Sequence, residues 1–153
     1  MDIAHDLLEA RLVASFATLD RDGSVHLVGM WFVWDGEAVL LPTSGTTRKV
    51  RNLERDARAT VMIDDSRAGL DLRGIVLAGR VSILRGAEAV LLNRRIHLKY
   101  LTESGRELPP VDRYLATDDV TIRLAPERTS SWDLRNTEQG RALAETGESR
   151  PLD

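Results

Sequence analysis

The sequence predicts an α+β domain that is mainly antiparallel β-structure, and three observations support this fold class. Apolar runs of strand length alternate with turn signals along most of the chain, whereas helical spacing of apolar residues is confined to a few segments. The 153 residues, 42% of them apolar, suit one domain with a single core. A small antiparallel β-barrel with short helices is the most economical arrangement of these elements.

The first part of the chain reads as a helix followed by three antiparallel strands. Apolar residues at helical spacing behind Asp2 predict a short opening helix within residues 2–13. Two Asp-Gly pairs between β-rich runs are strong hairpin signals, because both central residues of such a turn must accept positive φ. They lie in the segments 20–24 and 35–36, and they separate strands expected near 13–19, 25–34 and 37–42.

The strand expected at 25–34 is apolar on both faces. Its two alternating sets are Leu27, Gly29, Trp31 and Val33 on one side, and Val28, Met30, Phe32 and Trp34 on the other. A strand with one wet face alternates apolar and polar residues instead. We therefore expect one face to fill the barrel interior and the other to meet a ligand or a partner chain. Gly29 leaves a gap where a flat group could approach the backbone.

The rest of the chain supplies the remaining strands and one long helix, and a Gly- and Pro-containing segment at 103–112 is expected to end that helix. The expected elements are strands at 59–65 and 72–84, a helix at 86–101, and one or two strands around Pro126. Residues 1–135 would form the barrel domain. The polar residues 136–153 would form a mobile tail or an arm that contacts a partner.

Positive charge is concentrated in the segment 44–58, which holds five basic and two acidic residues in a chain of net charge −3. Its spacing predicts a short amphipathic helix with one apolar side and one basic side. The apolar side comprises Val50, Leu53 and Ala57, and the basic side comprises Arg48, Arg51, Asn52 and Arg55, with Lys49 beside Asn52.

The start of this basic helix suits a phosphate. Ser44, Gly45, Thr46 and Thr47 precede it, so small hydroxyls, a flexible glycine, the positive end of a helix dipole and cationic side chains come together. The alternative interpretation is a solvated helix face whose arginines pair with nearby acids.

Two runs of sequence together resemble the pyridoxamine 5′-phosphate oxidase-like superfamily of flavin and deazaflavin proteins. They are "ATLDRDGSVHLVGMWFVWDGE" and "VLLPTSGTTRKVRNLERDARATVMID", and the resemblance extends over about residues 8–84. It implies a split β-barrel, similar to FMN-binding proteins, with short flanking helices. It also implies a homodimer with the cofactor at the subunit interface.

The resemblance assigns the cofactor phosphate to the start of the basic helix. Arg48 and Lys49 match the phosphate-binding pair of the superfamily, and Thr47 matches its hydroxyl neighbour. Arg51 and Asn52 are more similar to the branch that binds the deazaflavin coenzyme F420, in which extra basic groups could meet the anionic lactyl-glutamyl tail. F420 is therefore the expected cofactor, and FMN is the alternative.

The rest of the cofactor is assigned in the same way. Thr43 and Ser44 match the strand end that approaches the ribityl chain, and Val28, Gly29 and Met30 match the strand segment beside the isoalloxazine ring. A further residue, Trp132, could reach a cofactor across the dimer, although packing in the core or at the interface is the favoured role.

The resemblance implies an F420-dependent oxidoreductase that transfers hydride between the deazaflavin and a small organic substrate. An FMN-binding flavoprotein and a noncatalytic cofactor-binding protein on the same fold remain alternatives, because fold alone does not decide function. Oxidation of vitamin B6 is not expected, since position 27 is leucine where the oxidases often have arginine, and Arg135 and Arg141 are spaced too loosely for a second phosphate site. No catalytic side chain is assigned, because the cofactor supplies the reactive chemistry.

Composition disfavours several other classes of protein. The absence of cysteine excludes disulfides and thiolate sites and fits the cytoplasm, and the N-terminus does not read as a signal peptide. Neither a membrane span nor nucleic-acid binding is expected from the hydropathy and charge. His5, His26 and His97 lack ligand spacing, so no metal site is predicted, and His97 is expected at the surface. Asp118 and Asp119 are expected to begin a strand.

Overall fold

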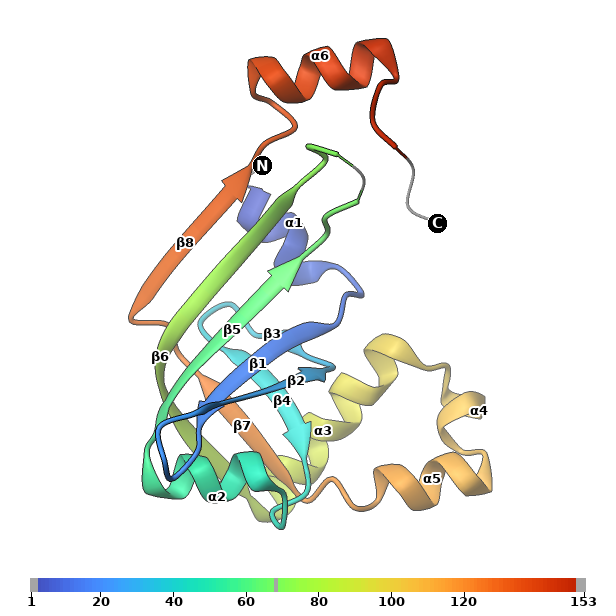
Figure 1. Cartoon of the computed structure of the whole chain (residues 1–153). Helices are drawn as coiled ribbons and strands as arrows, with labels where there is room; N and C mark the ends of the chain where they lie inside the picture. The colour runs from blue at the N-terminus through green and yellow to red at the C-terminus, as the bar shows by residue number, and fades with distance from the viewer. Residues whose placement is uncertain (1–2, 68, 151–153) are drawn as a thin grey trace.

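The computed structural model describes residues 3–67 and 69–150, and its strands follow the expected order along the chain. The strands are β1 (Ala14–Leu19), β2 (Val25–Met30), β3 (Val33–Trp34), β4 (Val39–Thr43), β5 (Arg58–Asp64), β6 (Arg73–Arg85), β7 (Val120–Leu124) and β8 (Arg128–Asp133). They form one curved antiparallel sheet in the order β2-β1-β5-β6-β7-β4-β3, with β8 paired to β6 (Figure 1). The expected α+β split barrel is confirmed.

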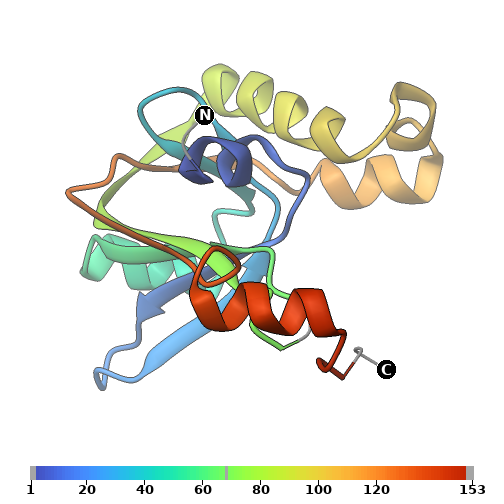
Figure 2. The ribbon, with the colours of Figure 1, turned by 90° about the horizontal axis from the view of Figure 1, so that it is seen from above.

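The helices flank this sheet on different sides (Figures 1 and 2). They are α1 (Ile3–Glu9), α2 (Arg48–Arg55), α3 (Gly86–Tyr100), α4 (Glu103–Arg106), α5 (Pro109–Leu115) and α6 (Glu138–Thr146). The segment at 103–112 does end α3, but it also starts two short helices that the sequence did not predict. Thr102 caps α4 by accepting a hydrogen bond from the Gly105 N–H, and two prolines begin α5.

Within the segment 136–153, which was expected to be a mobile tail or a partner-contacting arm, residues 138–146 form a helix, α6, that the sequence did not predict. Thr137 caps this helix by accepting a hydrogen bond from the Gly140 N–H, and Gly147 ends it in the left-handed conformation. The helix lies apart from α3, α4 and α5 (Figures 1 and 2). Residues 151–153 of the expected tail lie outside the described part of the chain.

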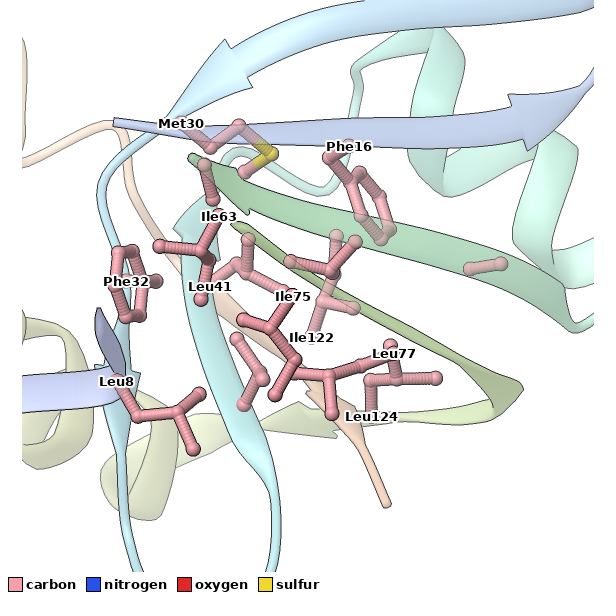
Figure 3. Close-up of a cluster of buried hydrophobic side chains, with 14 of the residues drawn as sticks. Leu8, Phe16, Met30, Phe32, Leu41, Ile63, Ile75, Leu77, Ile122 and Leu124 are labelled. Atoms are coloured by element: carbon pink, nitrogen blue, oxygen red, sulfur yellow. The ribbon is translucent and has the colours of Figure 1, made fainter. Parts of the chain in front are cut away.

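The core lies on the inner face of the curved sheet and is closed by helices. Phe16 on β1, Val61 on β5 and Leu77 on β6 lie opposite one another across the strands and are fully or almost fully buried. Leu8 from α1 and Leu53 from α2 join the same cluster, part of which Figure 3 shows. Burial of this apolar surface is the main force that holds the barrel together.

The opposite face of β2, β1, β5 and β6, called the outer face below, is uncovered and partly apolar. Val25 and Leu27 on β2 are 65% and 64% exposed, and Met62 on β5 is 36% exposed. The strand register places Ala17, Thr60 and Ala78 on this same face, opposite Leu27. The sequence therefore predicted correctly that β2 is apolar on both faces.

The single strand predicted at 25–34 is divided into β2 and β3, and its predicted alternation fails after Met30. Trp31 stacks on Tyr100 of α3 with ring centroids 4.8 Å apart. The Phe32 carbonyl accepts a hydrogen bond from the Lys99 ammonium at 3.1 Å and one from the Tyr100 hydroxyl at 3.3 Å. Contacts with α3 thus replace strand pairing at these two residues.

Strands β7 and β8 run consecutively along one edge of β6, with an interruption at Ala125–Glu127. Gly79 of β6 makes room for this interruption, because an added Cβ would lie 2.8 Å from the Ala125 carbonyl oxygen. The Glu127 N–H donates to the Ala78 carbonyl at 2.9 Å. The sequence left open one or two strands around Pro126, and the structure shows two.

The surface placement expected for His97 is wrong, since its side chain is buried beneath α4 and the loop before β7. Its relative exposure is 1%. The ring Nδ1 accepts a hydrogen bond from Arg106 Nε at 3.3 Å, so Nε2 carries the proton that is donated to Asp118 Oδ2 at 2.9 Å. The short helix α4, which the sequence did not reveal, supplies the arginine that makes this burial possible.

Candidate cofactor site

Helix α2 begins with backbone donors that the side chain of its N-cap residue does not cap. Thr47 is the N-cap residue, but its hydroxyl donates instead to the Ser44 carbonyl at 2.9 Å and lies 3.3 Å from the buried Thr43 hydroxyl. The N–H groups of the first helical turn therefore point outward without a side-chain acceptor from this cap. Such a helix start attracts an anion through both its N–H groups and its dipole.

The loop before α2 is held in place by an acid that the sequence analysis did not identify as part of the site. The Gly45 N–H donates to Asp119 Oδ1 at 2.7 Å, and the Ser44 and Thr46 hydroxyls lie 3.0 Å apart. Asp119 immediately precedes β7, whose Val120 pairs with Thr43 of β4. The loop is thus attached at both sides to paired strands.

Arg48, the first residue of α2, already has an acidic partner. Its Nε donates to Asp20 Oδ1 at 2.8 Å, and its NH2 group contacts the other carboxylate oxygen. These bonds, together with one from Asn52, lower the pKa of Asp20. A phosphate at this position would have to share Arg48 with Asp20.

Lys49 differs from Arg48, because its ammonium makes no hydrogen bond or ion pair with any residue in the described ranges. The side chain is half-buried, and this burial lowers the pKa of Lys49, while the charge of Asp118 acts in the opposite direction. An ammonium without a contacting carboxylate beside an open helix start is the strongest anion-binding feature of the site.

Asn52, which the helical spacing placed on the basic side of α2, is buried. It is 4% exposed, and its amide nitrogen donates to the Thr18 hydroxyl at 3.1 Å and to Asp20 Oδ1 at 2.9 Å. Its amide oxygen accepts from Arg55 at 3.1 Å. The burial arises because α2 packs against β1, which covers the edge of the polar side nearest that strand.

Arg51 remains exposed, as expected, and it lines an open hollow beside α2. Four arginines and two aspartates surround this hollow, so its charge balance is positive. They are Arg21, Arg48, Arg51, Arg55, Asp20 and Asp22, and Asn52 completes the lining. The arrangement can accommodate an extended anionic group next to the helix start.

The three residues assigned to the ring-binding segment of β2 do not share one face. Met30 and Val28 lie opposite the buried Ala14 and Phe16 and contribute to the inner core. Gly29 lies opposite Ser15 on the outer face. Because β2 pairs only with β1 in the sheet, its other edge also presents unpaired backbone groups to a ligand.

Trp132 on β8 packs against Gly74 of β6, where an added Cβ would lie 2.3 Å from the Trp132 ring. The side chain is half-buried. This contact agrees with the packing role favoured from the sequence.

Comparison with known proteins identifies the family. The family description "Pyridoxamine 5′-phosphate oxidase" matches residues 2–133 of this chain. The chain belongs to the pyridoxamine 5′-phosphate oxidase family. No curated protein matches it significantly.

Solved structures of pyridoxamine 5′-phosphate oxidase-like proteins agree with this membership. The conserved hypothetical protein Rv2991 from Mycobacterium tuberculosis is 30% identical over 88% of this chain and 86% of its own, with a TM-score of 0.73. A protein described as an F420 reductase is 25% identical over 85% of this chain and 98% of its own, with a TM-score of 0.65. HutZ, the heme storage protein from Vibrio cholerae, is 17% identical over 84% and 90% of the two chains, with a TM-score of 0.65, and shows the fold alone.

Among residues 3–67 and 69–150, the helices are too short or too polar to cross a bilayer. Within this pyridoxamine 5′-phosphate oxidase fold, the assigned residues fall into two groups. Thr43, Ser44, Thr47, Arg48 and Lys49 gather around the start of α2, whereas Val28, Gly29 and Met30 lie along β2.

Proposed function

We propose that this protein is an oxidoreductase that binds coenzyme F420 and transfers hydride between the deazaflavin and a small organic substrate. The observation that carries the proposal is the half-buried Lys49 ammonium, which lacks a hydrogen bond within the described chain and lies at the uncapped start of α2. The cofactor phosphate would accept hydrogen bonds from Lys49 and from the first-turn N–H groups. Family membership and the similarity to an F420 reductase support this assignment.

The hollow beside Arg51 favours F420 over FMN. Both cofactors carry a phosphate, but only F420 continues into an anionic lactyl-glutamyl tail. Arg51 is exposed and makes no ion pair with any described residue, so its guanidinium can meet this tail. Asn52 does not contact the tail in this proposal, because its amide hydrogen bonds are used inside the protein.

The ring would lie along β2 beside Gly29, where the space left by the missing side chain is partly filled by Val13, whose methyl carbon lies 3.1 Å from the position of an added Cβ. When bound, the cofactor supplies the hydride chemistry, and the protein orients the ring and excludes water. We propose that a second copy of the chain covers the outer face and completes the site. Val25, Leu27 and Met62 give this face the apolar character that suits a homodimer interface.

Light scattering tests the dimer directly. The expected mass is that of two chains, and a monodisperse monomer would refute this part of the proposal.

Fluorescence titration of the purified protein with F420 and with FMN tests the cofactor. We expect saturable binding of F420, and Lys49→Ala should weaken it by about tenfold or more because a charge-assisted contact is lost. Arg51→Gln should weaken F420 binding while leaving FMN binding unchanged. The exposed Arg95→Gln on α3 removes the same charge elsewhere and serves as the control.

Three results would change the assignment. The absence of saturable binding of either cofactor would reject it, and a preference for FMN would make the protein a flavoprotein. Unchanged affinity in Lys49→Ala would show that the phosphate lies elsewhere. The noncatalytic alternative predicts F420 binding without oxidation of reduced F420 by any substrate in a panel of activated alkenes and imines.

A further inference from the structure

Acidic side chains lie close to the start of α2, although positive charge is concentrated in this region. Asp20 Oδ1 accepts a hydrogen bond from Arg48 Nε at 2.8 Å. Asp118 interacts with Lys49 through its charge, and no hydrogen bond or ion pair joins these two described residues. The two cationic side chains assigned to the cofactor phosphate therefore each have an acid nearby.

The loop before α2 shows the same balance of charge. The Gly45 N–H donates to Asp119 Oδ1 at 2.7 Å, so one backbone donor of the loop is already used by a carboxylate. The Arg85 guanidinium lies 3.5 Å from the position of a Cβ added at Gly45, but it donates to Glu54 at 2.8 Å. The loop thus offers no excess of positive charge that would attract a strongly charged anion.

The Asp118 carboxylate is fixed by contacts that do not cancel its charge. Its Oδ2 accepts from His97 Nε2 at 2.9 Å, and the ring carries a single proton because Nδ1 accepts from Arg106. Arg106 in turn lies 3.6 Å from Asp112. The backbone carbonyl of Asp118 accepts from the buried Asn93 amide at 3.0 Å. The Asp118 side chain is only 19% exposed, so solvent screens its charge incompletely.

The charge of a phosphate decides how it responds to these acids. Because F420 continues beyond its phosphate into the lactyl group, that phosphate is a diester with one negative charge. The FMN phosphate is a monoester, which carries about 1.5 to 2 negative charges at pH 7. A doubly charged phosphate costs more to take out of water. At this site, Asp118 and Asp119 cancel part of the cationic attraction that would offset this cost.

We propose that Asp118 and Asp119 are specificity-determining residues, through which the α2 site selects a singly charged phosphodiester over a phosphate monoester. His97 and Asn93 are positioning residues that hold Asp118 in this role. The inference rests on the proposed function, because it assumes that the cofactor phosphate binds at Lys49. The first-turn N–H groups and Lys49 supply the attraction, and the two acids supply the discrimination. F420 thereby gains an advantage over FMN that does not depend on its tail.

Two pairs of synthetic ligands test the inference on the whole chain, because the members of each pair differ only in the charge at the phosphate. One pair is FMN and the methyl ester of its phosphate. The other is the 5′-phosphate of the F420 deazaflavin, without the tail, and its methyl ester. Fluorescence titration at about pH 7.5, where the monoester carries its second charge, should show tighter binding of the methyl ester.

Asp118→Asn is the decisive variant, because its amide oxygen can still accept from His97. The preference for the methyl ester should shrink by about fivefold, since one repulsive charge several ångströms from the phosphate is removed. Asp119→Asn, which keeps an acceptor for the Gly45 N–H, should act in the same direction and serves if Asp118→Asn does not fold. The control is Asp6→Asn, an exposed acid on α1 at the other end of the barrel from α2 (Figure 1), and it should change neither affinity.

Tighter binding of the monoester by the wild-type protein would overturn the inference, and so would an unchanged preference in both variants. Equal weakening of both members of a pair would also overturn it, because the acids would then only maintain the structure of the loop. Binding of the flavin pair without binding of F420 would reject the F420 assignment and still test the two acids. The absence of binding of all four ligands would reject the cofactor site and this inference together.

Discussion

Two basic regions of this protein use their positive charge differently. At α2, Arg48 is bound to Asp20, and Arg55 donates to both the Leu19 carbonyl and the Asn52 side chain. On the outer face, Arg80 and Arg128 have no such partners within the described chain. Two of the four basic residues of α2, Arg48 and Arg55, therefore connect the helix to the β1–β2 turn, whereas Arg80 interacts with Asp56 through its charge, without a hydrogen bond among the described residues.

The difference shows that a count of basic residues overstates the charge available to a ligand. Of the four basic side chains of α2, those of Lys49 and Arg51 make no hydrogen bond or ion pair among the described residues, and only Lys49 is half-buried. Arg48 is exposed, but its partner Asp20 satisfies much of its hydrogen-bonding capacity. Within α2, Lys49 and Arg51 are therefore the two cationic side chains left for a ligand, which the predictions below distinguish from structural ones.

The largest expected effect is on stability, from Asn52→Ala. The substitution removes the donor to Thr18 and Asp20 and the acceptor of Arg55, and Asn52 and Thr18 are both almost fully buried. Loss of this network should lower the free energy of unfolding by about 2 kcal/mol, since a buried polar group is left without a partner. Urea denaturation, monitored by fluorescence, measures this change in the free energy of unfolding.

Arg80→Gln provides the matched comparison on the outer face. This change should alter the free energy of unfolding much less, because Arg80 has no hydrogen-bond partner among the described residues. The loss of repulsion from Arg58 and the loss of attraction to Asp56 oppose each other, so the net effect should be within about 0.5 kcal/mol. Equal destabilisation by Asn52→Ala and Arg80→Gln would contradict the distinction between the two regions.

Much of the fold could be predicted from the sequence, because the signals involved are local. Alternating apolar residues and the two Asp-Gly turns located β1, β2 and β4, and the start of α2 was predicted from its hydroxyls and basic residues. Helices α4 and α5 were missed because proline and glycine in 103–112 read as a break. Strand β3 was not separated from β2, since the contact between Trp31 and Tyr100 joins residues far apart in the chain.

The parts of the candidate sites that could not be predicted depend on tertiary contacts. Asp119 looked like the start of a strand, yet it holds the Gly45 loop from across the β4–β7 pair. Asn52 matched the exposed side of a helix, yet packing against β1 buries it.

A smaller effect is expected from pH on F420 binding, and it tests whether Lys49 is the available charge at α2. Burial already lowers the pKa of Lys49 in the free protein, and a bound phosphate would raise this pKa again. Binding therefore takes up a proton between these two pKa values, so the affinity should fall as the pH rises through this range. The expected loss of F420 affinity between neutral pH and pH 10 is about tenfold, the contribution of one charge-assisted contact.

The control is Lys49→Arg, whose guanidinium stays charged throughout this range, so this part of the pH dependence should disappear. Parallel pH curves for the wild-type protein and Lys49→Arg would show that another group controls binding.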